Sequence, residues 1–123
     1  MAAAPAPPAR QLIQGYAAGG FRIAGVRHEG SVLVLPERTL AWPVAAPEQV
    51  TAKSLAPIAA AEPAVEILLL GLGPRFAIVA PELRAALREA GIVVEAMDTA
   101  AACRTFNLLV SEDRRVAAAL IAL

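Results

Sequence analysis

Apolar positions change their spacing along this chain, and each spacing predicts a different kind of element. The nearly continuous apolar run of residues 65–70 stops at Gly71-Leu72-Gly73. Such a run is typical of a parallel strand that is buried on both faces, whereas a half-exposed strand alternates apolar and polar residues. The sequence therefore predicts a buried strand over residues 65–70 and a glycine loop directly after it.

The next segment has helical spacing. Its apolar residues recur at i, i+3, i+4 and i+7, a stripe formed by Leu83, Ala86, Leu87 and Ala90. Pro81 suits the first turn, where its missing amide hydrogen is not needed. Gly91 suits the left-handed position after a helix. Residues 92–94 then predict a second buried strand, joined to the first by a right-handed crossover.

A second helix is predicted after Met97, with either Asp98 or Thr99 as its N-cap. The residues that would line its core side are Ala102, Cys103, Phe106 and Val110. Arg104 and Asn107, three residues apart, would share another face. Residues 116–121 then predict a last strand, although their alanines also permit a helix. The second half of the chain thus alternates strand and helix.

The first half predicts β structure. Residues 21–26 and 31–35 are rich in β-branched side chains and flank residues 27–30, where Gly30 can take the positive φ of a tight turn. This pattern predicts a hairpin with His28 at its tip. A short strand over 39–42 would follow and end at Pro43. Ser54 is a candidate cap for a short helix over residues 55–60.

Composition narrows the class of protein. A chain of 123 residues is long enough for one domain with a single core. Eleven basic residues balance eleven acidic ones, so the chain lacks the basic excess of nucleic-acid-binding proteins. No stretch approaches the ~18 apolar residues of a membrane span, so we expect no membrane insertion. The single cysteine fits a reducing compartment.

The start of the chain predicts a tail. It contains Pro5, Pro7 and Pro8 but neither a basic first segment nor an apolar core, so it does not fit a signal peptide. We expect a flexible tail over residues 1–11, one α/β domain over 12–123 and a cytoplasmic location.

Polar residues gather where the predicted strands end. The carboxyl ends of parallel strands meet at one edge of a sheet, so the loop of residues 71–75 should lie beside the turn of residues 97–99. Arg75 and Arg104 would then hold a carboxylate or phosphate, oriented by Thr105 and Asn107. The predicted ligand pocket comprises Gly71, Gly73, Arg75, Asp98, Thr99, Arg104, Thr105 and Asn107.

The same residues have a plainer interpretation. Asp98 and Thr99 would cap the helix, and Arg104 would pair with Glu95 or Asp98 on the surface, as such residues usually do.

No motif completes a catalytic or cofactor signature. Gly71-Leu72-Gly73 lacks the third glycine of a dinucleotide-binding turn, which favours a structural turn. His28 is the sole histidine and has no partners for a triad or a metal site. Cys103 and Trp42 are better interpreted as packing residues than as a reactive thiol or a ligand anchor. We therefore expect no cofactor, no metal and no catalytic residue.

Several short segments in order resemble a small domain-of-unknown-function family. These segments are Gly20-Phe21-Arg22-Ile23, Gly30-Ser31-Val32, Trp42, Ile67 to Gly73, Gly91-Ile92, Glu95-Ala96-Met97, Thr99-Ala100 and Arg104 to Leu109. The family includes mitochondrial respiratory complex I assembly factor three and the adipogenesis-associated Mth938-domain protein. The resemblance covers residues 12–123. It implies a three-layer α/β domain with an N-terminal β-hairpin layer, packed helices and a mixed central sheet of about five strands in order 2-1-5-3-4, the last antiparallel.

Two classes of function remain. The resemblance favours a non-enzymatic protein-interaction or assembly-factor-like domain, related to respiratory complex assembly, whose partner is another protein or a second copy. Zero net charge and high apolarity are compatible with such association. The alternative is a small-molecule-binding protein or an undiscovered enzyme that holds an anionic metabolite or nucleotide at the carboxyl ends of the strands.

Overall fold

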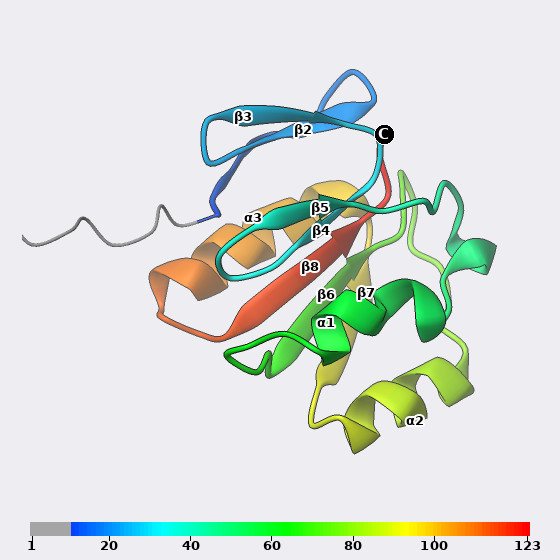
Figure 1. The fold of residues 1–123 in the computed structure, drawn as a ribbon. Coiled ribbons are helices and arrows are strands. Elements are labelled where there is room, and N and C mark those ends of the chain that lie inside the picture. Colours follow the sequence, from blue (N-terminus) through cyan, green and yellow to red (C-terminus); the bar gives the residue numbers. More distant parts are fainter. Residues whose placement is uncertain (1–10) are drawn as a thin grey trace, which may run out of the picture.

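Two β-sheets organise the protein (Figure 1). The computed structural model describes residues 11–123, so the predicted tail lies outside the described residues except for Gln11. The small antiparallel sheet contains β1 (Ile13–Gly15), β2 (Gly20–Ile23) and β3 (Val26–Glu29). The central sheet contains β4 (Val32–Val34), β5 (Thr39–Ala41), β6 (Ile67–Gly71), β7 (Val93–Met97) and β8 (Val116–Leu120).

Helices cover both faces of the central sheet. One face carries α1 (Ala56–Ala59) and α2 (Pro81–Glu89), and the other carries α3 (Thr99–Ser111) (Figure 1). Two short 3-10 helices, η1 (Pro47–Gln49) and η2 (Lys53–Leu55), precede α1. The small sheet packs on the α3 side, because Ile13, Phe21 and Ile23 share a buried cluster with Phe106 of α3. The domain is therefore the expected three-layer α/β structure.

The strands of the central sheet follow the order β5-β4-β8-β6-β7. Numbered along the chain from β4, this is the expected order 2-1-5-3-4. β6 is parallel to both β7 and β8, while β4 is antiparallel to β8 and β5. The last strand, β8, is thus antiparallel to β4 but parallel to β6. A helical crossover precedes β7 and another precedes β8, and each returns the chain to the same end of the sheet. The strand that runs against the other four is β4.

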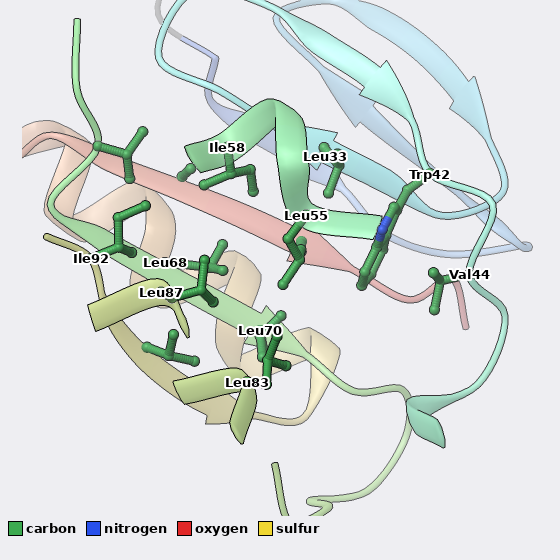
Figure 2. Packing of buried hydrophobic residues seen from close by; sticks show 14 of the residues in the cluster. Leu33, Trp42, Val44, Leu55, Ile58, Leu68, Leu70, Leu83, Leu87 and Ile92 are labelled. Carbon is green, nitrogen blue, oxygen red and sulfur yellow. The ribbon is translucent and has the colours of Figure 1, made fainter. Parts of the chain in front are cut away.

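β6 supplies apolar side chains to both cores, as its continuous apolar run predicts. Leu68 and Leu70 pack with Leu83 and Leu87 of α2 on one face (Figure 2). Leu69 lies in the other cluster, on the α3 side. The strand is therefore buried on both faces, and the two helices of the crossovers each cover one of them.

The predicted helices of the second half are confirmed. Leu83 and Leu87 are buried along α2, but Ala86 and Ala90 of the predicted apolar stripe are exposed. Asp98 is the N-cap of α3, since the backbone N of Ala101 donates to its Oδ1 at 2.9 Å. The predicted core side of α3 is buried at Ala102, Cys103 and Phe106, and Val110 packs beside them. Trp42 is also buried and donates from Nε1 to the carbonyl of Ser54 at 3.0 Å, as expected for a packing residue.

The predicted hairpin is wrong in its position. Its turn lies at Ala24-Gly25, between β2 and β3, and both residues have positive φ, 49° and 81°. A two-residue turn of this kind needs positive φ twice, and alanine rarely adopts it, so no sequence pattern marks this turn. His28 therefore lies within β3, opposite Phe21, and not at a turn tip.

The short helix after Val50 is confirmed, but Ser54 is not its cap. Ser54 lies inside η2, where its backbone N donates to Thr51 Oγ1 at 3.1 Å. Its own Oγ accepts from the backbone N of Thr51 at 3.0 Å. The two side chains thus stabilise the turn that leads into the helix.

Candidate functional site

The two polar turns lie side by side at the carboxyl ends of β6 and β7, as the topology predicts. The backbone N of Leu72 donates to the carbonyl of Met97 at 2.9 Å, and the backbone N of Thr99 donates to the carbonyl of Gly73 at 2.8 Å. The glycine loop and the turn before α3 therefore form one contiguous rim of the sheet.

The hydroxyl of Thr99 accepts one hydrogen bond from the backbone and donates another to it. Thr99 is fully buried, and its Oγ1 accepts from the backbone N of Gly73 at 2.9 Å. It also donates to the carbonyl of Ile121 at 2.8 Å. The backbone N of Ile121 in turn donates to the carbonyl of Gly71 at 2.9 Å. One hydroxyl thus joins three segments of the chain that are far apart in sequence.

Packing and backbone conformation explain why positions 71 and 73 of the loop are glycines. A Cβ on Gly71 would lie 2.9 Å from Leu120 Cδ2 and 3.0 Å from Thr99 Cα, so a side chain there would push α3 away from the sheet. Gly73 has a φ of 96°, which side-chain-bearing residues rarely adopt. Both observations fit the interpretation of this loop as a structural turn.

Of the remaining predicted residues, Asp98 belongs to the rim, Arg75 follows it in the loop, and three residues of α3 lie further away. The carboxylate of Asp98 caps α3 through the Ala101 amide. Arg75 is exposed on the loop. Arg104 and Asn107 are five and eight residues beyond Thr99, which carries them about 8 and 12 Å along the helix axis. Thr105, half-buried, lies between them on the same helix. The structure therefore groups Gly71, Gly73, Asp98 and Thr99, and places Arg104, Thr105 and Asn107 in a second group.

Asn107 serves as a partner for the edge strand β1. Its Oδ1 accepts from the backbone N of Ile13 at 2.8 Å, and its Nδ2 donates to the carbonyl of the same residue, also at 2.8 Å. Arg104 lies near the same strand, with Nη1 at 3.5 Å from the Tyr16 hydroxyl. The expected pairing of Arg104 with Glu95 or Asp98 does not occur. An anionic ligand held between Arg75 and Arg104 stays a prediction.

A cavity that sequence reasoning missed lies on the α2 side of the rim. It has a volume of about 330 Å³ and lies between η1, the end of β6, residues 77–80 and the start of α2. Its walls include Val50, Leu70, Leu72 and Leu83, with Glu48 as a charged member. None of the eight predicted pocket residues, all of them described, lines it. Apart from Glu48, the residues that line the cavity have apolar side chains.

Two large apolar side chains are exposed next to this cavity. Phe76 is 66% exposed and Ile78 is 89% exposed, and Ile78 belongs to the wall of the cavity. The sequence signal is the run of residues 76–79 between Pro74 and Pro81. In a loop, four consecutive apolar residues are unexpected unless they have a function.

The single cysteine is buried, as expected for a packing residue. Burial raises the pKa of the Cys103 thiol to about 12, so the thiol stays protonated and unreactive near neutral pH. Residues 11–123 contain no cluster of His, Cys, Asp or Glu side chains that could hold a metal ion. Within the same residues, no helix has the length and apolarity needed to cross a membrane.

Comparison with known proteins extends this description. The chain is 40% identical over 110 residues to the NADH dehydrogenase [ubiquinone] 1 alpha subcomplex assembly factor 3 of Xenopus tropicalis, a match over 89% of this chain and 60% of that protein. The chain therefore spans less than two thirds of this relative's length.

Solved structures share the fold over nearly the whole chain. An outer membrane protein from Bartonella henselae superposes with a TM-score of 0.86 at 37% identity, covering 94% of this chain and 97% of that one. A Mth938-like domain of Bordetella pertussis superposes with a TM-score of 0.80 at 32% identity, covering 99% and 91%. The model of the family described as "Protein of unknown function (DUF498/DUF598)" matches residues 13–121. This chain belongs to that family.

Proposed function

We propose that this chain is a protein-binding domain that acts in the assembly of a larger complex. We further propose that its partner binds to the surface formed by Phe76, Ile78 and the apolar cavity beside them, called here the loop surface. The frog relative is named as an assembly factor of the respiratory NADH dehydrogenase, and this name motivates the partner class, a subunit of such a respiratory complex.

The observation that carries the proposal is the exposure of Phe76 and Ile78 beside a cavity with apolar walls. Burial of such a side chain in an interface stabilises a complex by about 1.5–3 kcal/mol. Exposed apolar patches rimmed by polar residues often mark protein interaction sites. Arg75 and Glu82 flank the loop surface in the sequence, and both are exposed. The loop surface therefore has the apolar centre and charged surroundings of a protein interface.

The small-molecule alternative has less support. At the rim, the Thr99 hydroxyl, one Asp98 carboxylate oxygen and the Gly73 backbone already bond to the protein. On α3, the Asn107 amide is bonded to β1. A ligand there would have to be held mainly by Arg75 and Arg104. A thermal-shift screen with phosphate, nucleotides and carboxylated metabolites tests this alternative, since saturating ligand stabilises the folded state.

The proposal is tested by affinity capture from the source cells, followed by mass spectrometry. We expect the unmodified chain to capture subunits of the respiratory NADH dehydrogenase, and Ile78→Asp to lose them. Leu108→Asp is the matched control, because Leu108 is 58% exposed on α3 and does not line the cavity. Capture that both variants retain would contradict the loop surface. Capture of no respiratory subunit by the unmodified chain would contradict the partner class.

A further inference from the structure

Within residues 11–123, the segment Phe76–Val79 is a strand-like stretch that pairs with no strand. Its side chains alternate, with Phe76 and Ile78 exposed, Ala77 half-buried and Val79 buried. It contains no bend, and within the described residues its backbone N–H and C=O groups make no hydrogen bond to the protein. Alternation of this kind is the pattern of a strand with one buried and one open face. The backbone groups of the segment are thus available for hydrogen bonds with another strand.

Three edge strands, β1, β3 and β7, carry protecting side chains, in contrast to this segment. At β7, Arg84 donates from Nη1 to the carbonyl of Val94 at 2.6 Å. At β1, Asn107 occupies both backbone groups of Ile13. At β3, charged side chains form the ion pair between Arg27 and Glu29 at 2.8 Å. Charges and side-chain caps of this sort prevent edge-to-edge pairing. Phe76–Val79 carries neither device.

The charges at the ends of the segment favour a second copy as the occupant. Arg75 precedes it and Glu82 follows it, and residues 76–81 between them are uncharged. Both charged side chains are exposed, and neither forms a salt bridge within residues 11–123. When two copies of the segment align antiparallel about Ala77, Arg75 of each lies opposite Val79 of the other, three residues before Glu82 of that copy. A parallel alignment would instead bring like charges together, which is unfavourable.

We infer that two copies of this chain associate by antiparallel pairing of Phe76–Val79 about a two-fold axis at Ala77. Phe76 of one copy then lies opposite Ile78 of the other. In an antiparallel pair, opposite residues share a face, so this register gathers four exposed apolar side chains into one cluster. A two-fold interface needs only one self-complementary surface, and this segment has one. Strand addition is a common mode of protein recognition.

This inference deepens the proposed function, because a second copy and a partner protein would compete for the loop surface. Self-pairing would keep Phe76 and Ile78 out of water until a partner displaces the second copy. The two ideas fail separately. A monomeric protein that captures a respiratory subunit overturns only the dimer, and a dimer that captures none overturns only the proposed function.

Sedimentation equilibrium of the purified chain over a range of concentrations is the first test. We expect a reversible dimer, weakened about tenfold or more in Ile78→Asp, which places a charge in the apolar cluster. Leu108→Asp, on α3, should dimerise like the unmodified chain. A protein that stays monomeric at the highest concentration overturns the inference. A dimer that Ile78→Asp leaves intact overturns it as well.

The alignment of the two copies is tested by exchange of the charges. Arg75→Glu and Glu82→Arg should each weaken the dimer by about two- to fivefold, as expected for exposed ion pairs. The double variant should restore the affinity, because opposite charges are then near each other again. Additive losses in the double variant would overturn the antiparallel alignment.

Oxidative cross-linking tests the register. An Ala77→Cys variant should form a covalent dimer, since residues on the two-fold axis lie within the reach of a disulfide. A Val93→Cys variant is the control, because Val93 is 58% exposed but lies on β7. Cys103 is buried and should not react in either variant. Equal cross-linking at positions 77 and 93 would overturn the register.

Discussion

The rim of the central sheet and the segment Phe76–Val79 are almost consecutive in sequence, yet their groups are used in opposite ways. At the rim, the hydroxyl of Thr99 and the backbone of Gly73 are bonded inside the protein. In Phe76–Val79, apolar side chains are exposed and the backbone is not bonded to the described chain. In these two regions, then, the polar residues of the rim stabilise the fold. The exposed apolar residues of Phe76–Val79 form the candidate binding surface.

This contrast changes how such a sequence should be interpreted. A search for hydroxyls, carboxylates and amides near strand ends finds the residues that hold the rim together. The binding surface is instead indicated by apolar residues in a place where a soluble domain has no core to bury them. The following substitutions test both halves of the contrast.

Among the polar residues, the largest effect is expected for Thr99→Val. The variant keeps the shape of the side chain but leaves the buried Gly73 N–H and Ile121 carbonyl without their partner. We expect the free energy of unfolding to fall by about 2–4 kcal/mol, measured by urea denaturation. Thr99→Ser, which keeps the hydroxyl, should lose clearly less. Equal stability of the valine variant and the unmodified chain would show that the junction does not stabilise the rim.

A smaller loss is expected for Asn107→Ala. The side chain makes two hydrogen bonds to Ile13, so its removal should cost about 1–2 kcal/mol and expose β1 to solvent. Hydrogen exchange should show faster exchange at the amide of Ile13. Asn107→Asp keeps the acceptor for that amide but cannot donate to the carbonyl, so an intermediate loss is expected. If exchange at Ile13 is unchanged in the alanine variant, Asn107 does not hold the edge.

Asp98→Ala should cost about 1 kcal/mol, the usual value of a helix N-cap. The lost interaction is the hydrogen bond that Asp98 accepts from the amide of Ala101. Asp98→Ser retains a capping oxygen and should be close to the unmodified chain in thermal denaturation. A ligand-binding role for Asp98 would instead appear as lost ligand affinity in both variants.

The smallest effect is expected for Ile78→Ser. At 89% exposure the side chain contributes little to the core, so stability should change by less than about 0.5 kcal/mol. Leu70→Ala is the buried comparison from the same cavity wall and should cost about 2–5 kcal/mol. A loss above 1 kcal/mol for Ile78→Ser would show that the loop surface is structural.

Local patterns predicted most of the second half of the fold. The run before Gly71, the stripe of α2 and the cap at Asp98 all depend on residues close in sequence, so spacing and capping rules suffice. The turn at Ala24-Gly25 was not predicted because alanine is not a residue that indicates a positive φ. The strand order came from the family resemblance, since pairing of β8 with β4 and β6 joins distant parts of the chain.

The candidate site was harder to predict, for the same physical reason. The sequence places Thr99 and Asn107 near strand ends and on a helix, but their roles depend on contacts with Ile121 and Ile13. These partners are 22 and 94 residues away in sequence. The exposure of Ile78 likewise depends on there being no strand beside residues 76–79 to cover it. An apolar run alone does not distinguish a core strand from an uncovered one.

The hydroxyl of Thr99 makes the far end of the chain a support for the glycine loop. Because Ile121 is tied to Gly71 through its amide and to Thr99 through its carbonyl, a deletion after Leu120 would loosen the loop without altering any of its residues.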